Sequence, residues 1–213
     1  MLVASVTVSL DGYLAGPGIS REQPMGEGGA RLHEWIMDPT PTDLELISQT
    51  FAAVGAVVLG RRTFDVGRAH WNDDTPYPAA SFVVTHRPHD EIPTASASFV
   101  FAPDLLDAVD RARAAAGEKQ VMLMGADVTQ QALDAGLVDE LRLQVAPFLL
   151  GSGTRLFTGK EQRSFECLDA RVTSHVTHLR FRSVARSTRH RDDAAWHRGH
   201  QHVVTGGGGL RSR

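Results

Sequence analysis

Three apolar segments of the sequence each run into a short polar turn that could bind an anionic ligand. Residues 60–63 read GRRT, residues 85–87 read THR, and residues 125–127 read GAD. A glycine lets backbone N–H groups approach a phosphate, and the start of a following helix favours negative charge. Arginine adds a fixed charge and a fork of donors that fits phosphate oxygens. Taken singly, each turn suits an ordinary exposed strand end equally well, but three together favour a phosphate-bearing ligand.

Several standard motifs are absent from the sequence. Neither G-x-G-x-x-G nor G-x-x-x-x-G-K-[ST] occurs, which argues against a standard Rossmann or P-loop site. No G-x-S-x-G elbow supports a nucleophilic serine. His197, His200 and His202 stand close together near the C-terminus, but that segment offers no scaffold, so no metal site is expected.

Hydrophobic periodicity indicates the elements that must hold these turns. Residues 2–9 alternate with period two, as a strand does, and lead into Asp11. The glycine- and proline-rich residues 15–30 then predict a long loop of the kind that often binds or covers a ligand. Thr42 and Glu45 have the spacing of a capping box at the start of a helix. Beyond that helix, strands and helices alternate, and strands alone follow.

This order of elements predicts the fold class. Alternation implies parallel crossovers, and the closing strands imply an antiparallel finish. We expect one α/β domain over residues 1–184 with three layers, in which a mixed central sheet has helices on both faces and antiparallel C-terminal strands. Residues 185–213 hold six arginines, two aspartates and four of the ten histidines without a sustained apolar period. They predict a flexible basic tail.

The composition limits the class of protein further. Hydrophobic residues make up 42% and charged residues 22% of the chain, as in an ordinary globular protein, and the net charge is only -3. We therefore expect no nucleic-acid or membrane partner. A single cysteine, Cys167, allows no internal disulfide, and no signal peptide or apolar run of roughly 20 residues is apparent. A cytoplasmic protein acting on a small molecule is expected.

Four segments resemble one known family. They are VSLDGYLAG, VVLGRRTFD, MGADVTQQALDAGLVDEL and PFLLGSGTRLF. In this order they resemble the small proteins related to the reductase domain of riboflavin biosynthesis, the RibD C-terminal domain, over about residues 1 to 182. That family has the dihydrofolate reductase-like fold and generally uses NADPH. The resemblance therefore implies this fold, an NADPH-dependent oxidoreductase and a homodimer.

The resemblance also implies where the cofactor binds. GRRT resembles the turn of dihydrofolate reductases that meets the cofactor phosphates, and VTHRP the strand end that meets the adenosine 2′-phosphate. GADVTQ resembles the turn and helix start under the pyrophosphate, and the nicotinamide would lie near the first strand. The expected cofactor contacts are Ala4, Ser5, Gly60, Arg61, Arg62, Thr63, Thr85, His86, Arg87, Gly125, Ala126, Asp127, Val128 and Thr129.

Two departures from the family pattern bear on the substrate. The riboflavin enzyme usually has a lysine where Ser5 stands, which argues against a pyrimidine ribose-phosphate substrate. Its zinc deaminase half is absent, because one cysteine cannot supply both H-x-E and P-C-x-x-C.

Three acids are candidates for proton handling, and each has a structural alternative. Asp11 stands where the first strand meets the loop, and equally suits a turn. Asp43 has nearly the spacing from the GRRT turn that the substrate-binding acid of dihydrofolate reductases has, and equally suits a first helical turn. Glu140, in VDEL, resembles an acid near the site of the riboflavin enzyme, and equally suits a surface strand. Asp11 and Trp35 are the candidate substrate contacts, although the indole of Trp35 also suits core packing.

Together these observations predict an NADPH-dependent reductase that transfers hydride to a C=N-type bond of a small heterocycle or an imine. The cofactor would do the hard chemistry, while the protein orients it and supplies a proton. The alternative is a non-catalytic protein that binds NADPH or a flavin.

Overall fold

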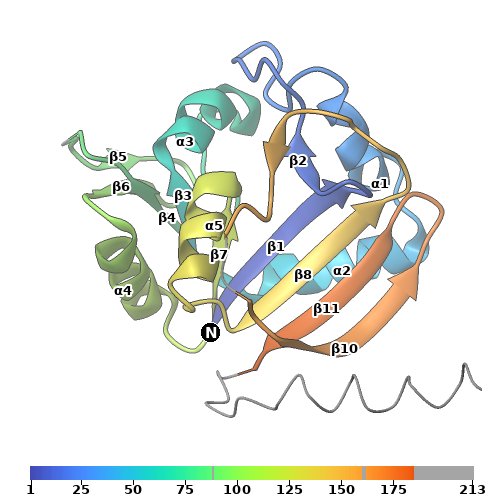
Figure 1. The fold of residues 1–213 in the computed structure, drawn as a ribbon. Coiled ribbons are helices and arrows are strands. Elements are labelled where there is room, and N and C mark those ends of the chain that lie inside the picture. The colour runs from blue at the N-terminus through green and yellow to red at the C-terminus, as the bar shows by residue number, and fades with distance from the viewer. Residues whose placement is uncertain (88, 160–161, 185–213) are drawn as a thin grey trace, which may run out of the picture.

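A mixed nine-stranded sheet forms the centre of the molecule (Figure 1). The structure, a computed structural model, describes residues 1–87, 89–159 and 162–184. The predicted tail, residues 185–213, lies outside the described residues. In the order in which they lie side by side, the strands are β10 (Phe165–Val172), β11 (Thr177–Ser183), β8 (Glu140–Ala146), β1 (Leu2–Ser9), β7 (Gln120–Met124), β3 (Val54–Gly60), β4 (Ala80–Val84), β6 (Ser98–Ala102) and β5 (Ile92–Pro93).

The pairing of these strands confirms the predicted fold class. The six strands from β8 to β6 are mutually parallel, whereas β11 runs antiparallel to β8 and β10 antiparallel to β11. The short β5 is antiparallel to β6. Outside the sheet, β2 (Tyr13–Ala15) pairs with β9 (Thr154–Arg155). The chain therefore ends, as predicted, with antiparallel strands beside a parallel set.

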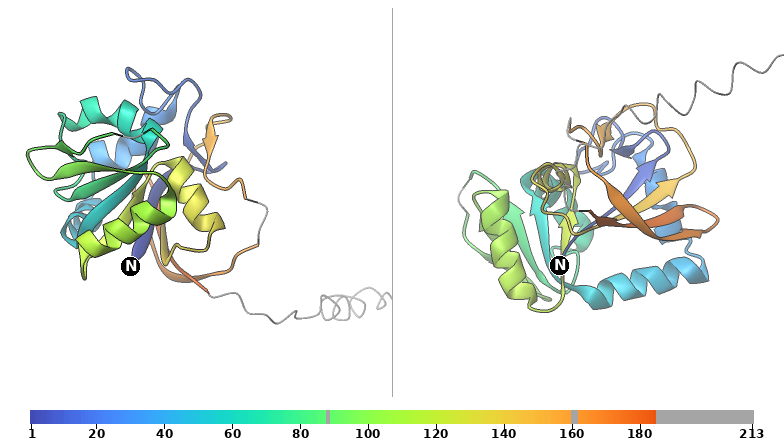
Figure 2. Two further views of the ribbon diagram at one scale, coloured as in Figure 1. Left: turned by 90° about the vertical axis from the view of Figure 1, so that its left-hand side faces the viewer. Right: turned by 60° about the horizontal axis from the view of Figure 1, so that its bottom comes forward.

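Helices cover both faces of the sheet. One face packs against α4 (Leu105–Ala116) and α5 (Ala126–Asp134) through a core that includes Leu2, Ala4 and Val6. The other face packs against α3 (Arg61–Gly67), α1 (Glu34–Met37) and α2 (Pro41–Ala53). Figure 2 shows α2 on the opposite side of the sheet from α4 and α5. Two 3₁₀ helices, η1 (Gly29–His33) and η2 (Arg68–Trp71), complete the elements.

The start of α2 differs from the sequence prediction. The capping box is formed by Thr40 and Asp43, not by Thr42 and Glu45. Pro41 is the reason, because proline is favoured in the first turn of a helix, where its missing N–H costs nothing. The helix therefore begins two residues earlier than predicted, and Asp43 takes the position whose carboxylate reaches back to the cap.

The second half of β1 pairs with a neighbouring strand on one side only. This strand pairs with β7 only over Leu2–Ala4, whereas its pairing with β8 continues from Val3 to Ser9. On the β7 side, the second half of β1 has no strand partner in the described part of the chain. β1 therefore runs on past the carboxyl end of β7, where a predicted turn begins.

Candidate active site

The carboxyl ends of β3, β4 and β7 bring residues from the three predicted turns into one pocket. Gly60 pairs with Val84 and Leu59 pairs with Met124, so the three strands end level with one another. The pocket has a volume of about 300 Å³. It is lined by Arg61, Arg62, Val84, Thr85, His86, Arg87, Asp104, Leu105, Asp127 and Gln131.

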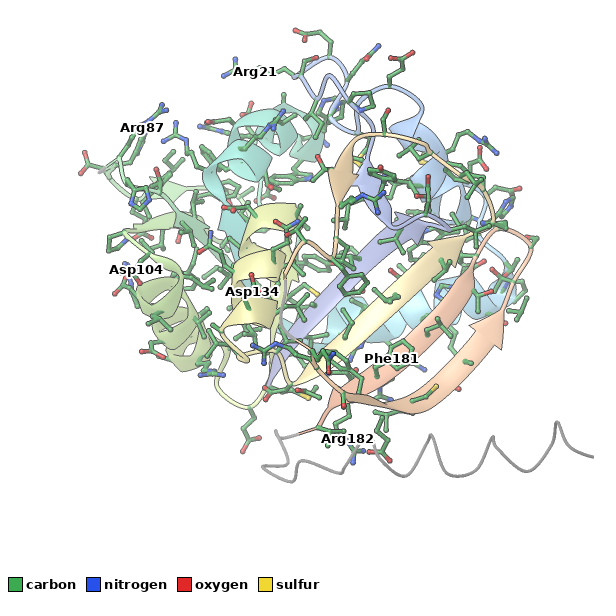
Figure 3. All side chains as sticks on the ribbon, viewed as in Figure 1. Arg21, Arg87, Asp104, Asp134, Phe181 and Arg182 are labelled. Atoms are coloured by element: carbon green, nitrogen blue, oxygen red, sulfur yellow. The ribbon has the colours of Figure 1, made fainter. Side chains whose placement is uncertain are left out.

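The cations of this pocket differ in how they are held. Arg61 donates from Nε to Asp65 Oδ1 at 2.9 Å, so its charge is already paired. Arg62 and Arg87 are exposed and form no ion pair with any residue the structure describes. Figure 3 shows Arg87 and Asp104 on the same side of the molecule. Arg62 and Arg87 are therefore the cations best placed to meet an anion.

The third turn is shaped by a close approach between β7 and α3. Gly125 has φ +95°, and a Cβ there would overlap the hydroxyl of Thr63. Glycine is thus required both by the backbone conformation and by the space. The first turn of α5 follows directly and has no side-chain cap. Asp127 in that turn is exposed and accepts a hydrogen bond from Gln131 at 3.1 Å.

Other residues predicted to contact the cofactor lie behind this surface. Ala4 and Val128 are completely buried in the core under α5. Thr129 is also completely buried, and its hydroxyl has no hydrogen-bond partner among the described residues. Ser5 is partly exposed and, because side chains alternate along a strand, points to the opposite face from Ala4. If Ala4 contacts a cofactor, it does so through its backbone.

A second set of polar residues is buried on the α2 side of the sheet. Asp43 accepts a 2.6 Å hydrogen bond at Oδ1 from His178 Nε2, and the edge of Trp35 meets the His178 ring with centroids 5.1 Å apart. The indole N–H of Trp35 donates to Thr7 Oγ1 at 3.1 Å. The structure therefore brings together Asp43 and Trp35, two of the residues predicted from sequence, through a histidine that the sequence did not single out.

Hydrogen bonds favour the ionised form of the Asp43 carboxyl. The side chain is completely buried, and burial alone would raise its pKa. Hydrogen bonds from the Thr40 hydroxyl, the His178 ring and the Thr40 N–H outweigh burial and hold the pKa of Asp43 below its ordinary value. All of its nearby donors are directed at the charged form.

Strand register adds a residue that sequence reasoning missed. Thr7 on β1 and His178 on β11 are both partners of Gln144 on β8, so the three side chains form one row on the face covered by α1 and α2. All three are at least nine-tenths buried. The period-two pattern of β8 and β11 was a signal that these residues share faces, but only the register aligns them.

The carboxylate of Asp11 stabilises a turn. Its carboxylate accepts hydrogen bonds from the Ser9 hydroxyl at 2.5 Å and from the N–H groups of Leu150 and Gly151 at 3.0 and 2.8 Å. The hydrogen bond from Ser9 is the main reason that the pKa of Asp11 falls to about 2. This geometry joins the β1–β2 turn to the loop after β8.

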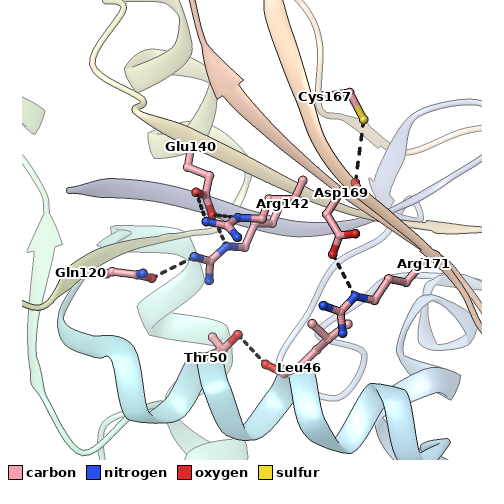
Figure 4. A network of polar contacts seen from close by, with 9 residues as sticks. Leu46, Thr50, Gln120, Glu140, Arg142, Cys167, Asp169 and Arg171 are labelled. Carbon is pink, nitrogen blue, oxygen red and sulfur yellow. Dashed lines mark hydrogen bonds and ion pairs between the residues drawn. The ribbon is translucent and has the colours of Figure 1, made fainter.

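Glu140 lies at the opposite end of the sheet from the three turns, because it is the first residue of β8. It is only 4% exposed. Its carboxylate binds Arg142 at 2.6 Å (Figure 4). It also binds Arg180, at 2.8 Å. Burial acts to raise the pKa of Glu140, but the two arginines outweigh it and lower the pKa. The structure therefore does not bring the three candidate acids together.

Two further findings concern the described residues. No group of three or more histidine, cysteine, aspartate or glutamate side chains there is arranged to hold a metal ion. No helix among them is long and apolar enough to cross a membrane.

A second cavity, of about 350 Å³, lies between α5 and strands β8, β10 and β11. Leu133, Leu141 and Phe181 are among the mainly apolar side chains that line it, and Figure 3 shows Phe181 on this side of the sheet. None of the residues predicted as site residues lines this cavity.

Comparisons with known proteins support the same fold. An uncharacterised protein of Bacillus subtilis (strain 168), YyaP, is 26% identical over 174 residues, which cover 76% of this chain and 82% of YyaP. A solved structure of a Shewanella sp. PV-4 protein assigned to riboflavin biosynthesis superposes with a TM-score of 0.65 at 22% identity, covering 86% of this chain and 99% of that one. Dihydrofolate reductase from Enterococcus faecalis, solved with NADP(H), superposes with a TM-score of 0.55 at 14% identity, covering 87% of this chain and 97% of that one.

The two solved structures confirm the predicted dihydrofolate reductase-like fold. The model of the family described as the RibD C-terminal domain matches residues 1–188. That match spans all of the described sheet and each of the three turns that line the pocket. The chain therefore belongs to the RibD C-terminal domain family.

Proposed function

We propose that this protein is an NADPH-dependent reductase that transfers hydride to a C=N-type bond of a small, planar heterocycle or an imine. The observation that carries the proposal is the pocket at the carboxyl ends of β3, β4 and β7. In an open α/β sheet, ligands bind outside these ends. Arg62 and Arg87, neither of which forms an ion pair with a described residue, line the pocket, so it suits an anion.

The residues of the pocket fit a dinucleotide that carries an extra phosphate. Arg62 and Arg87 would bind the adenosine 2′-phosphate, since neither is engaged in an ion pair with a described residue. The uncapped N-terminus of α5 and the close backbone at Gly125 would hold the pyrophosphate. When bound, NADPH supplies a hydride. The dihydrofolate reductase from Enterococcus faecalis, with the same fold, was solved with NADP(H).

The acceptor would bind on the face of β1 that carries Ser5 and Thr7. That part of β1 has no described strand partner on its β7 side, and Trp35 donates a hydrogen bond to Thr7. Asp43 and His178 lie beyond Trp35 on the same face and share a hydrogen bond. The protein's part in the reaction would be to orient the acceptor and to hold a proton between Asp43 Oδ1 and His178 Nε2 for the reduced product.

A second candidate function is a protein that holds NADPH or a flavin without turnover. The observation that favours it is the state of the acids, because Asp11, Asp43 and Glu140 are each engaged in hydrogen bonds that stabilise the fold. This alternative uses the same pocket but needs no proton donor.

Ligand-induced stabilisation of the full chain tests the proposal. NADPH, NADH, FMN and folate would each be titrated against the purified protein, and the melting temperature would be followed. A ligand present at 100 times its dissociation constant stabilises the folded state by about 2.7 kcal/mol. We expect NADPH to raise the melting temperature more than NADH. A shift with FMN alone would contradict the assignment of NADPH.

A further inference from the structure

Gln144 is a nearly buried polar side chain without a partner. It is 8% exposed, and its carboxamide makes no hydrogen bond with any residue in the described part of the chain, yet its amide atoms are not among the fully enclosed polar atoms that lack a partner. A buried amide normally finds hydrogen bonds, because leaving its donor and acceptor unmade costs stability. The amide of Gln144 instead keeps contact with solvent, so that water or a ligand can supply its hydrogen bonds.

The neighbours of Gln144 in the row are already engaged. The Thr7 hydroxyl accepts from Trp35 at 3.1 Å, and His178 Nε2 is bonded to Asp43 at 2.6 Å. Both are direct register partners of Gln144, one on each side. The carboxamide is therefore flanked by two groups whose own hydrogen bonds hold them in place. Its N–H₂ and C=O remain available to a ligand.

The strand that carries Thr7 runs on past the end of its neighbour β7. Beyond Ala4, β1 has no strand partner on its β7 side within the described residues, so Thr7 has a strand neighbour only on its β8 side. The turn at Gly125, where we place the cofactor, begins where β7 ends beside β1. An acceptor entering there would meet the face that carries the row.

We propose that Gln144 binds the polar edge of the hydride acceptor and so determines which acceptors are used. This proposal rests on the proposed reductase function. A carboxamide presents one donor and one acceptor side by side. It is matched by a planar group with an adjacent N–H and C=O, as in a lactam, or with an N–H and a ring nitrogen, as in an amidine-like ring.

The charged side chains around Thr7, Gln144 and His178 indicate that the polar edge of the hydride acceptor is uncharged. Arg142 and Arg180, on the same face, are both paired with Glu140. On β10, the register partner of His178 is Arg171, which is paired with Asp169 at 2.9 Å (Figure 4). Together with the Asp43–His178 pair, these contacts leave no unpaired charge beside Gln144 among the described residues. A charged edge would have to lose its hydration without gaining a counter-ion.

Stability measurements separate a ligand-binding amide from a structural one. Gln144→Met keeps the length of the side chain and removes both the donor and the acceptor. If Gln144 awaits a ligand, this change leaves the melting temperature of the free protein unchanged or raises it, because residues kept for function often cost stability. A clear fall in melting temperature would overturn the proposal. Gln49→Met, the same change at an exposed position of α2, is the matched control.

Binding of a small probe tests the recognition itself. The probe is 2-pyridone, a planar lactam, and its partner is N-methyl-2-pyridone, in which the donor is blocked. Ligand-observed NMR on the full chain would give both affinities. We expect wild type and Gln49→Met to prefer 2-pyridone, and Gln144→Met to bind it roughly tenfold more weakly, because two hydrogen bonds are lost. Gln144→Asn, which keeps the amide on a shorter stem, should lose less.

The outcomes distinguish this proposal from the reductase function. No binding of 2-pyridone to wild type, or equal binding to wild type and Gln144→Met, would overturn the role of Gln144 and leave the NADPH titration untouched. Conversely, binding of 2-pyridone that depends on Gln144, with no stabilisation by NADPH, would support the amide-edge site while contradicting the reductase.

Discussion

His178 on β11 donates a 2.6 Å hydrogen bond to Asp43 at the start of α2, across 135 positions of the sequence. The same Asp43 caps α2 through Thr40. One carboxylate therefore joins the helix start to the antiparallel end of the sheet. Because Trp35 packs on His178 and binds Thr7, the pair also fixes the wall of the proposed acceptor site.

Replacing Asp43 by asparagine should reduce stability and turnover but not NADPH affinity. The variant loses charged hydrogen bonds, each of which contributes about 1.5–3 kcal/mol, so the free energy of unfolding should fall by at least that amount in urea titrations. If the carboxylate helps to supply the proton, turnover should fall by roughly 100- to 10,000-fold. Asp38→Asn is the control, since the Asp38 side chain is 91% exposed. Equal stability of the two variants would contradict the buried-pair interpretation.

The contribution of Asp11 should depend on pH in a defined direction. Its pKa is about 2 in the folded protein, below the ordinary 3.8. A lowered pKa means that the contribution to stability is complete above about pH 4 and is lost as the pH falls towards 2. The difference in melting temperature between wild type and Asp11→Asn should therefore be constant from pH 7 to pH 5 and shrink below pH 4. A difference that grows with acidity would contradict the assigned hydrogen bonds.

Arg87 and Arg62 should make the protein bind NADPH more tightly than NADH. The two cofactors differ by one phosphate, and a charged hydrogen bond to it contributes roughly 1.5–3 kcal/mol, or about 10- to 150-fold in affinity. Arg87→Ala and Arg62→Ala should each weaken NADPH by this factor and barely change NADH. Arg61→Ala should have less effect, because Arg61 is paired with Asp65.

Calorimetry in moderate salt would measure these affinities, since salt removes diffuse charge effects. Arg113→Ala, at an exposed position of α4 outside the pocket, controls for a change in net charge. If all of these substitutions weaken both cofactors alike, the assignment of the arginines to the 2′-phosphate is wrong.

Gly125→Ala, in the third turn, should reduce the free energy of unfolding more than Gly117→Ala does. A positive φ costs a non-glycine residue roughly 1–3 kcal/mol, and at Gly125 the added Cβ also overlaps Thr63. Gly117→Ala reports the backbone term alone, because its φ is +56° with nothing within 4 Å of the new Cβ. Chemical denaturation should show the larger loss for Gly125→Ala. Adding Thr63→Ala should recover part of the difference, and no recovery would exclude the close approach as the cause.

Residues 185–213 should be dispensable for folding and cofactor binding. Their polar composition cannot bury enough apolar surface to offset the entropy lost on ordering. A chain ending at Val184 should keep the melting temperature and the NADPH affinity of the full chain, measured by calorimetry. A large loss of either would show that the segment packs on the domain or enters the site.

The sequence by itself determined the elements and the position of the pocket. Strand periodicity and glycine-containing turns mark the boundaries locally, and the carboxyl ends of parallel strands meet at one edge. For that reason the amino-acid pattern alone is enough to predict that residues 60–63, 85–87 and 125–127 lie together. The capping box lies two residues earlier than the spacing of Thr42 and Glu45 suggests, because Pro41 favours the first helical turn.

Only the tertiary structure decided which polar residues face one another on the α2 side. Thr7, Gln144 and His178 share a row because of the register of three strands, and a slip of one residue would turn every side chain of a strand to the opposite face. Local sequence does not set that register, since Asp43 and His178 come from segments 135 positions apart. For the same reason Glu140, a candidate by resemblance, proved to lie at the far end of β8, where two arginines neutralise it.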